Sequence, residues 1–225
     1  MSNGLPRHAR IVVVGGGVVG SSMAYQLTLA GVPDVVLLER GALGCGTSWH
    51  AAGLIMQLRG SHTTTEIAKY NAEFYPELEA DTGMATGFKQ NGTLAIGRNK
   101  DRVHEIKRRA SLASSFGIDA HMLSPNEVKQ MYPALDESLV TGGMFIPKDG
   151  QLSPVDTINA LIAGAKKRGA RIFENTLVEK MQQLASGEYR LETTNGIINC
   201  ETLVLACGLW TRDFAAQLGA RVPLH

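Results

Sequence analysis

The feature that most constrains this chain is a glycine-rich segment that directly follows a short apolar run near the N-terminus. Residues 11–14 (Ile-Val-Val-Val) are continuously apolar, which is typical of a parallel strand buried on both faces. In the segment that follows, Gly15, Gly17 and Gly20 have the spacing G-x-G-x-x-G. The first glycine of this pattern permits a tight turn, the second lets the backbone approach a pyrophosphate, and the third lets a helix pack closely on the strand. We therefore expect a strand, a phosphate-binding turn and a helix.

The residues after the glycines complete a nucleotide-binding pattern. Residues 21–30 are predicted to form a helix that stops at Gly31, and amide groups at its N-terminus would hold phosphates. A second apolar run, residues 35–38, ends in Glu39. A carboxylate at this place accepts hydrogen bonds from ribose hydroxyls and repels a 2′-phosphate. A glycine-rich turn without function is the alternative, but the order of strand, glycines, helix, strand and acid favours dinucleotide binding.

The composition is that of a globular protein without a strong charge bias. Apolar residues make up 44% of the chain and charged residues 19%, with a net charge of +1, so no nucleic acid is expected as a partner. The apolar stretches are strand-sized, so we expect no membrane span, and residues 1–10 lack the apolar core of a secretory signal. The cysteines share no metal-ligand spacing, so we expect reduced thiols and no metal. These features predict a cytoplasmic protein, or one of the mitochondrial matrix in a eukaryote.

The middle of the chain has a different organisation. Helical character extends over residues 63–80 and 101–116, and Ser124 and Glu127 have the spacing of a capping box. Residues 88–97 are predicted to form a hairpin around an Asn-Gly turn. Because this block breaks the alternation of strands and helices, residues 62–150 are predicted to be part of an α+β substrate or cap domain.

The nucleotide-binding pattern resumes after this block. Ser153 and Pro154 are typical of a helix start. The strands expected after that helix are residues 171–175, 177–184, 189–193, 197–200 and 203–208, with a hairpin turn at Asn195-Gly196. A β-meander followed by a second strand-to-glycine turn is typical of flavin-binding Rossmann domains. The predicted fold class is α/β: an FAD-binding Rossmann-like domain of the glutathione-reductase type (residues 9–61 and 151–225), interrupted by the domain of residues 62–150.

The chain also resembles a known family over essentially all of its length. Besides the glycine fingerprint, the shared motifs are Leu38-Glu39-Arg40, Gly46-Thr-Ser-Trp-His-Ala-Ala-Gly53, Gly92-Thr-Leu94, Asp149-Gly150 and Ala206-Cys-Gly-Leu-Trp210. In these motifs the chain is similar to the amine-oxidising flavoproteins of the D-amino-acid oxidase superfamily, most closely to the dimethylglycine and sarcosine dehydrogenase branch. Because family members continue well beyond the matched region, we expect this chain to be an N-terminal portion that is inactive alone.

The resemblance implies FAD as the cofactor and identifies the residues that hold it. It implies contacts from the glycine fingerprint, the end of the second strand, the loop that carries His50, a later strand that meets the adenine, and the second glycine turn. The predicted cofactor-binding residues are Gly15, Gly17, Val18, Val19, Gly20, Glu39, Arg40, Gly46, Thr47, Ser48, Trp49, His50, Ala51, Ala52, Gly53, Leu54, Val178 and Gly208. In the related branch, the histidine at the position of His50 is bonded to the 8α carbon of the flavin.

The chemistry of His50 is consistent with a covalent link. A neutral imidazole nitrogen is a good nucleophile, and the small residues that flank His50 would let its loop approach the flavin closely. An imidazolyl substituent withdraws electrons, which should raise the flavin potential and ease the oxidation of an amine. The alternative is a histidine that only donates or accepts a hydrogen bond in a cofactor loop. Spacing alone favours this alternative, whereas the resemblance favours covalent attachment.

The function implied by the resemblance is FAD-dependent oxidation of a secondary or tertiary amine. An N-methyl amino acid such as sarcosine or dimethylglycine would lose a hydride to flavin N5 and undergo oxidative N-demethylation. Oxygen or an electron-transfer protein would then accept the electrons, and the catalytic residues are expected downstream of residue 225. Two alternatives stay open: an NAD-dependent Rossmann dehydrogenase, and a non-catalytic regulatory relative of the flavoproteins. His50 argues against both.

Overall fold

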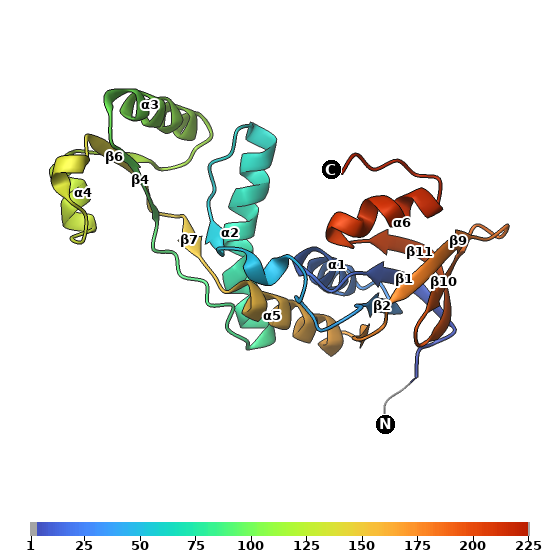
Figure 1. The fold of residues 1–225 in the computed structure, drawn as a ribbon. Coiled ribbons are helices and arrows are strands. Elements are labelled where there is room, and N and C mark those ends of the chain that lie inside the picture. Colours follow the sequence, from blue (N-terminus) through green and yellow to red (C-terminus); the bar gives the residue numbers. More distant parts are fainter. Residues whose placement is uncertain (1–3, 225) are drawn as a thin grey trace. The chain divides into compact units, whose positions relative to one another are not determined.

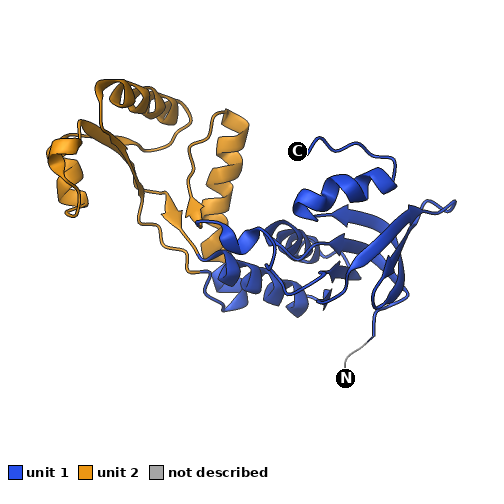
Figure 2. Ribbon diagram, viewed as in Figure 1, with its two compact units in different colours: residues 1–52, 78–86, 153–225 blue, residues 53–77, 87–152 orange. Residues whose placement is uncertain are grey.

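The computed structural model describes residues 4–224, and the chain divides into two compact units (Figure 2). The first unit contains the residues up to 52, residues 78–86 and the residues from 153 onward, and the second contains residues 53–77 and 87–152. This division differs from the predicted ranges. Residues 53–61 fall in the second unit, and residues 78–86, at the end of a long helix, fall in the first.

A six-stranded sheet forms the centre of the first unit (Figure 1). Its strands, in the spatial order β8-β2-β1-β11-β10-β9, are Arg171–Phe173, Val35–Leu38, His8–Val14, Gly196–Leu205, Tyr189–Thr193 and Val178–Gln183. The strands from β8 to β11 run parallel, and β11, β10 and β9 form an antiparallel meander. The predicted α/β Rossmann-like fold with its meander is therefore confirmed.

Two details of the meander were predicted wrongly. The segments 197–200 and 203–208 were expected to be separate strands, but β11 continues without interruption from Gly196 to Leu205. Its first part pairs with β10 and its later part with β1, so one long strand joins the meander to the parallel sheet. The hairpin turn is also displaced by one residue. Thr193 pairs with Gly196, so the turn consists of Thr194 and Asn195.

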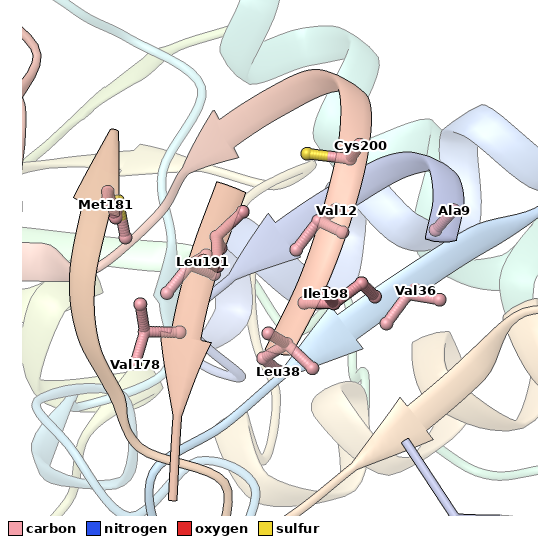
Figure 3. Close-up of a cluster of buried hydrophobic side chains, with 10 residues drawn as sticks. Ala9, Val12, Val36, Leu38, Val178, Met181, Leu191, Ile198 and Cys200 are labelled. Atoms are coloured by element: carbon pink, nitrogen blue, oxygen red, sulfur yellow. The ribbon is translucent and has the colours of Figure 1, made fainter. Parts of the chain in front are cut away.

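Helices cover the sheet, and an apolar core fills one of its sides. Helices α1 (Val18–Leu29) and α5 (Pro154–Lys167) pack on each other, while α6 (Thr211–Gln217) contacts β9 and β11. Ser153 caps α5 by accepting a hydrogen bond from the Asp156 amide, as predicted. Figure 3 shows the core cluster in which side chains of β1 and β2 meet those of the meander. Its members are Ala9, Val12, Val14, Val36, Leu38, Val178, Met181, Leu191, Ile198 and Cys200.

The second unit combines short strands with three helices. Its strands β4 (Thr93–Gly97), β6 (Gly142–Ile146) and β5 (His121–Leu123) form an antiparallel sheet in that order, and β3 (Leu54–Ile55) pairs with β7 (Gly150–Gln151). The helices are α3 (Lys100–Ser115), α4 (Pro125–Met131) and the first part of α2 (His62–Thr82). No helix within residues 4–224 is long and apolar enough to cross a membrane.

One local prediction in the second unit holds and another fails. The capping box is present, since the Ser124 hydroxyl accepts a hydrogen bond from the Glu127 amide and the Glu127 carboxylate accepts one from the Ser124 amide. The hairpin predicted for residues 88–97 is wrong, because β4 pairs with β6 and Lys89 pairs with Gln151. Gly92 instead has a φ of +79° and donates its amide hydrogen to the Asp149 carbonyl oxygen.

Candidate functional site

A cavity of about 630 Å³ opens in the first unit at the carboxyl ends of the parallel strands. The last residues of β1, β2 and β11 (Val14, Leu38 and Leu205) line it. This is where open parallel sheets bind their ligands. The predicted cofactor-binding residues that line the cavity are Gly15, Gly17, Val18, Val19, Glu39, Arg40, Gly46, Thr47, Ser48, Ala51, Val178 and Gly208.

The glycine turn after β1 is shaped by contacts that exclude larger side chains. Gly15 has a φ of +111°, and a Cβ atom there would lie 2.3 Å from the carbonyl oxygen of Ala206. A Cβ atom on Gly20 would lie 1.8 Å from the Gly15 carbonyl oxygen. The first glycine thus lets the turn approach the loop after β11, and the third lets α1 approach the turn. Both positions require glycine for close backbone contact.

The N-terminus of α1 faces the cavity and is joined there to the loop that carries His50. Gly17 is the N-cap residue, and Val18 and Val19 line the cavity. The amide of Val18 donates a hydrogen bond to the Ser48 hydroxyl oxygen over 3.0 Å. The remaining amide groups of the first turn and the helix dipole make such a helix end a suitable place for an anion.

Glu39 has a structural role in addition to the predicted role at the ribose. Its side chain is buried, with 8% of the residue exposed. One carboxylate oxygen accepts a hydrogen bond from the Gly16 amide over 2.6 Å, and the other accepts one from the Gly41 amide over 2.9 Å. These bonds brace the glycine turn from the end of β2. The Cys45 thiol also donates to the second oxygen over 3.8 Å. Because a carboxylate offers about four acceptor positions, Glu39 keeps about one for a ribose hydroxyl.

The segment after β11 also lines the cavity. Cys207 places its Sγ 3.4 Å from the Val14 carbonyl oxygen, and burial raises the pKa of this thiol to about 11. Cys207 is therefore a protonated, packed residue at neutral pH and not a nucleophile. Further along, the guanidinium carbon of Arg40 lies 3.9 Å from the centre of the Trp210 ring. This cation–π contact joins the residue after Glu39 to the second turn.

The structure does not bring all of the predicted residues to the cavity. His50 lies in a short 3-10 helix (Ser48–His50), is exposed, and has its ring centre 3.8 Å from that of Trp49. Its neighbours Ser48 and Ala51 line the cavity. The predicted residues outside the cavity lining are Gly20, Trp49, His50, Ala52, Gly53 and Leu54. The last two belong to the second unit, where Leu54 is part of β3.

Sequence reasoning missed part of the cavity wall. These residues are Val14, Leu38, Thr176, Leu177, Leu205, Ala206, Cys207, Trp210, Thr211 and Phe214. The strand ends among them could have been found, because carboxyl ends of neighbouring parallel strands converge. Thr176 has no such signal: its amide donates to the Glu39 carbonyl oxygen, and the Asn195 side chain donates to its hydroxyl.

The cavity fits the adenosine diphosphate portion of FAD. Its volume lies in the range of small-molecule sites. Apolar side chains stay exposed around it, including Val19 at 66% and Trp210 at 43%. Together with a helix N-terminus for phosphates and Glu39 for a ribose, these surfaces match the apolar, anionic and hydroxyl groups of a dinucleotide.

Comparisons with known proteins also indicate an FAD-binding protein. The family described as FAD dependent oxidoreductase matches residues 10–225. The 4-methylaminobutanoate oxidase (formaldehyde-forming) of Paenarthrobacter nicotinovorans is 41% identical over 221 residues, which cover 98% of this chain and 27% of that protein. Mitochondrial sarcosine dehydrogenase of Mus musculus is 38% identical over 229 residues, covering 99% of this chain and 25% of that protein. The chain thus spans about a quarter of the length of these two relatives.

A solved structure has the same fold. The crystal structure of L-proline dehydrogenase from P. horikoshii superposes with a TM-score of 0.88 at 28% sequence identity. The match covers 97% of this chain and 57% of that one. It therefore includes both compact units and the cavity-bearing sheet.

Proposed function

The chain belongs to the FAD dependent oxidoreductase family, and on that premise we propose that it is the cofactor-binding part of an enzyme that oxidises a secondary or tertiary amine. The family resemblance drawn from its motifs is thereby confirmed. Two observations together carry the proposal: the cavity fits the adenosine diphosphate portion of FAD, and the chain is 41% identical to an oxidase named for releasing formaldehyde. An N-methyl amino acid, such as sarcosine or dimethylglycine, is the substrate class that we propose.

Different residues of the cavity would bind different groups of FAD. The N-terminus of α1 would hold the pyrophosphate, because Gly17, Val18 and Val19 line the cavity there and a helix N-terminus favours an anion. Glu39 would accept a hydrogen bond from the ribose, and the backbone at Val178 would meet the adenine. FAD, when bound there, would supply flavin N5 as the acceptor for a hydride from the carbon next to the amine nitrogen. Water then hydrolyses the oxidised amine, and an N-methyl group leaves as formaldehyde.

His50 is proposed to hold the flavin through a covalent bond from an imidazole nitrogen to the 8α carbon. The N–H and an 8α C–H bond would break, and oxygen from the air would take up the two electrons and two protons as hydrogen peroxide. The imidazole is exposed, so its nitrogens are accessible. It lies between Ser48 and Ala51, which both line the cavity, and the Ser48 hydroxyl fixes this loop to α1. The loop is therefore anchored to α1 before the histidine and lines the cavity again directly after it. Oxygen or an electron-transfer protein is the proposed acceptor of the electrons.

The test is to purify the chain with FAD in air, precipitate it with acid, and look for flavin fluorescence on the protein after denaturing electrophoresis. We expect the unmodified chain to retain the flavin and His50→Ala to bind FAD but release it in acid. His104→Ala is the matched control, because it removes another exposed histidine, on α3. Fluorescence that survives in His50→Ala would contradict the link. A chain that binds NAD and no FAD would contradict the whole proposal and favour a dehydrogenase of the NAD type.

The substrate class can be tested in a chimera. Replacing the matching quarter of the Paenarthrobacter oxidase by this chain supplies the rest of a related enzyme, since the two are 41% identical over this region. We expect the chimera to release formaldehyde from N-methyl amino acids, and the chain alone to show no turnover. A chimera that folds and holds flavin but oxidises no amine would favour a non-catalytic relative.

A further inference from the structure

The contact between Arg40 and Trp210 spans the glycine turn. Arg40 follows Glu39, the first residue after β2, and Trp210 ends the short 3-10 helix (Gly208–Trp210) between β11 and α6. In the sheet, β2 and β11 lie on opposite sides of β1, whose carboxyl end leads into the glycine turn. The two segments therefore flank that turn, and the guanidinium lies 3.9 Å from the ring centre of Trp210 to join them. Both residues line the cavity.

The contact is also free to break. Arg40 is exposed, and Trp210 is 43% exposed, so neither side chain is locked in the apolar core. Arg40 can leave the ring by rotating about its own side-chain bonds, without a change in the sheet. An exposed cation–π contact is weak enough to open and close on its own.

We propose that Arg40 and Trp210 form a gate across the cavity, which opens to admit the cofactor and closes over its adenosine end. This inference rests on the proposed function, because it takes FAD as the molecule that enters. The position of Arg40 next to Glu39, the predicted partner of the ribose, places the gate at the adenosine end. Arg40 and Trp210 are thus positioning residues that control exchange of the cofactor rather than residues that react.

A gate has a kinetic signature that an ordinary binding contact lacks. If entry and release both require the open form, and the contact closes equally well over an empty and a filled cavity, both rates are reduced by the fraction of molecules that are open. Removing the gate then raises both rates, by about two- to five-fold for an exposed cation–π contact. The dissociation constant changes little, since the two rates move together. A residue that simply contacts bound FAD would raise only the dissociation rate when removed.

The experiment measures FAD exchange by stopped-flow flavin fluorescence in a His50→Ala background, where no covalent link interferes. The variants are Trp210→Ala, Arg40→Gln and the double variant. We expect each single variant to raise both rates, and the double variant to match the single ones, because either change removes the whole contact. Trp210→Phe keeps an aromatic face and is expected to restore part of the slow exchange. Arg212→Gln, on α6, is the matched control and should leave both rates unchanged.

Several results would overturn the proposal. Unchanged rates, a rise in the dissociation rate alone, or additive effects in the double variant would each rule out a gate. Urea unfolding of every variant checks that the first unit stays folded, which the exposure of both side chains leads us to expect. Failure of the unmodified chain to bind FAD would instead overturn the proposed function together with the gate. The two failures are therefore distinguishable.

Discussion

Replacing Gly15 by alanine should separate the two turns that form the cavity. The added Cβ atom would lie 2.3 Å from the carbonyl oxygen of Ala206 and 2.8 Å from its carbonyl carbon. These are backbone atoms of the residue that follows β11, so no side-chain rotation can relieve the clash. Gly15 also has a φ of +111°, which side-chain-bearing residues rarely adopt.

The expected loss of stability follows from these two costs. A non-glycine residue in such a backbone conformation costs about 1–3 kcal/mol, and overpacking a close contact costs about another 1–3 kcal/mol. The sum, about 2–6 kcal/mol, is a large share of the roughly 5–15 kcal/mol that stabilises a typical domain. The glycine turn would either shift away from the second turn or pull the first unit toward unfolding. Either result should also weaken FAD binding.

Urea unfolding followed by tryptophan fluorescence measures this loss in the appropriate unit, because Trp49 and Trp210 both lie in the first one. Gly208→Ala is the matched control. Gly208 has a φ of +56° with no atom within 4 Å of the Cβ position. The Gly208→Ala variant should therefore lose only about 1–2 kcal/mol of stability, the cost of a left-handed backbone conformation. If Gly15→Ala lost no more stability than Gly208→Ala, the argument from close backbone approach would be wrong.

Two further predictions follow from pKa shifts. Burial raises the pKa of Cys200 and Cys207 to about 11, whereas Cys45 is exposed, so iodoacetamide near neutral pH should label Cys45 first. Peptide mass mapping checks this order, and equal labelling of the three thiols would contradict it. Arg168 donates a hydrogen bond to Asp81 over 2.6 Å and holds the pKa of that carboxyl below its usual value. Asp81 therefore stabilises the fold above its unfolded pKa of about 3.9, and this contribution is lost as the pH falls through the lowered folded pKa. Asp81→Asn should flatten the acid side of the stability curve measured by urea unfolding, and an unaltered curve would count against the assignment.

The parts of the fold that could be predicted are those that short sequence patterns specify. The apolar runs before Gly15 and before Glu39 form the buried strands β1 and β2, and α1 follows the glycines as expected. Ser153 and Ser124 cap helices because a hydroxyl three residues before a free amide is a local interaction. In each case the partners are close in the chain, so no knowledge of the tertiary structure is needed.

The pairing of distant strands could not be predicted in the same way. Asn91-Gly92 has a strong hairpin signal, yet Gly92 packs beneath the Phe145 ring, where a Cβ atom would lie 2.2 Å from a ring carbon. Here tertiary contacts use the positive φ of glycine for packing and not for a hairpin. Similarly, the single long strand β11 follows from its pairing with β1, which lies at the other end of the sequence. Both contacts join residues that are far apart in the sequence, so local conformational preferences cannot predict them.

The site itself shows how such a distant contact gives a residue its role. The pattern around Ser48 predicts a small-residue loop, and the pattern around Val18 predicts a helix start, but neither predicts that they meet. The hydrogen bond between them spans 30 residues of sequence and joins the loop of His50 to the end of α1 that faces the cavity. Because the same helix end is the proposed phosphate site, the histidine and the pyrophosphate would share one anchor. The position of His50 relative to the flavin would then depend on the glycine turn as much as on the residues next to His50.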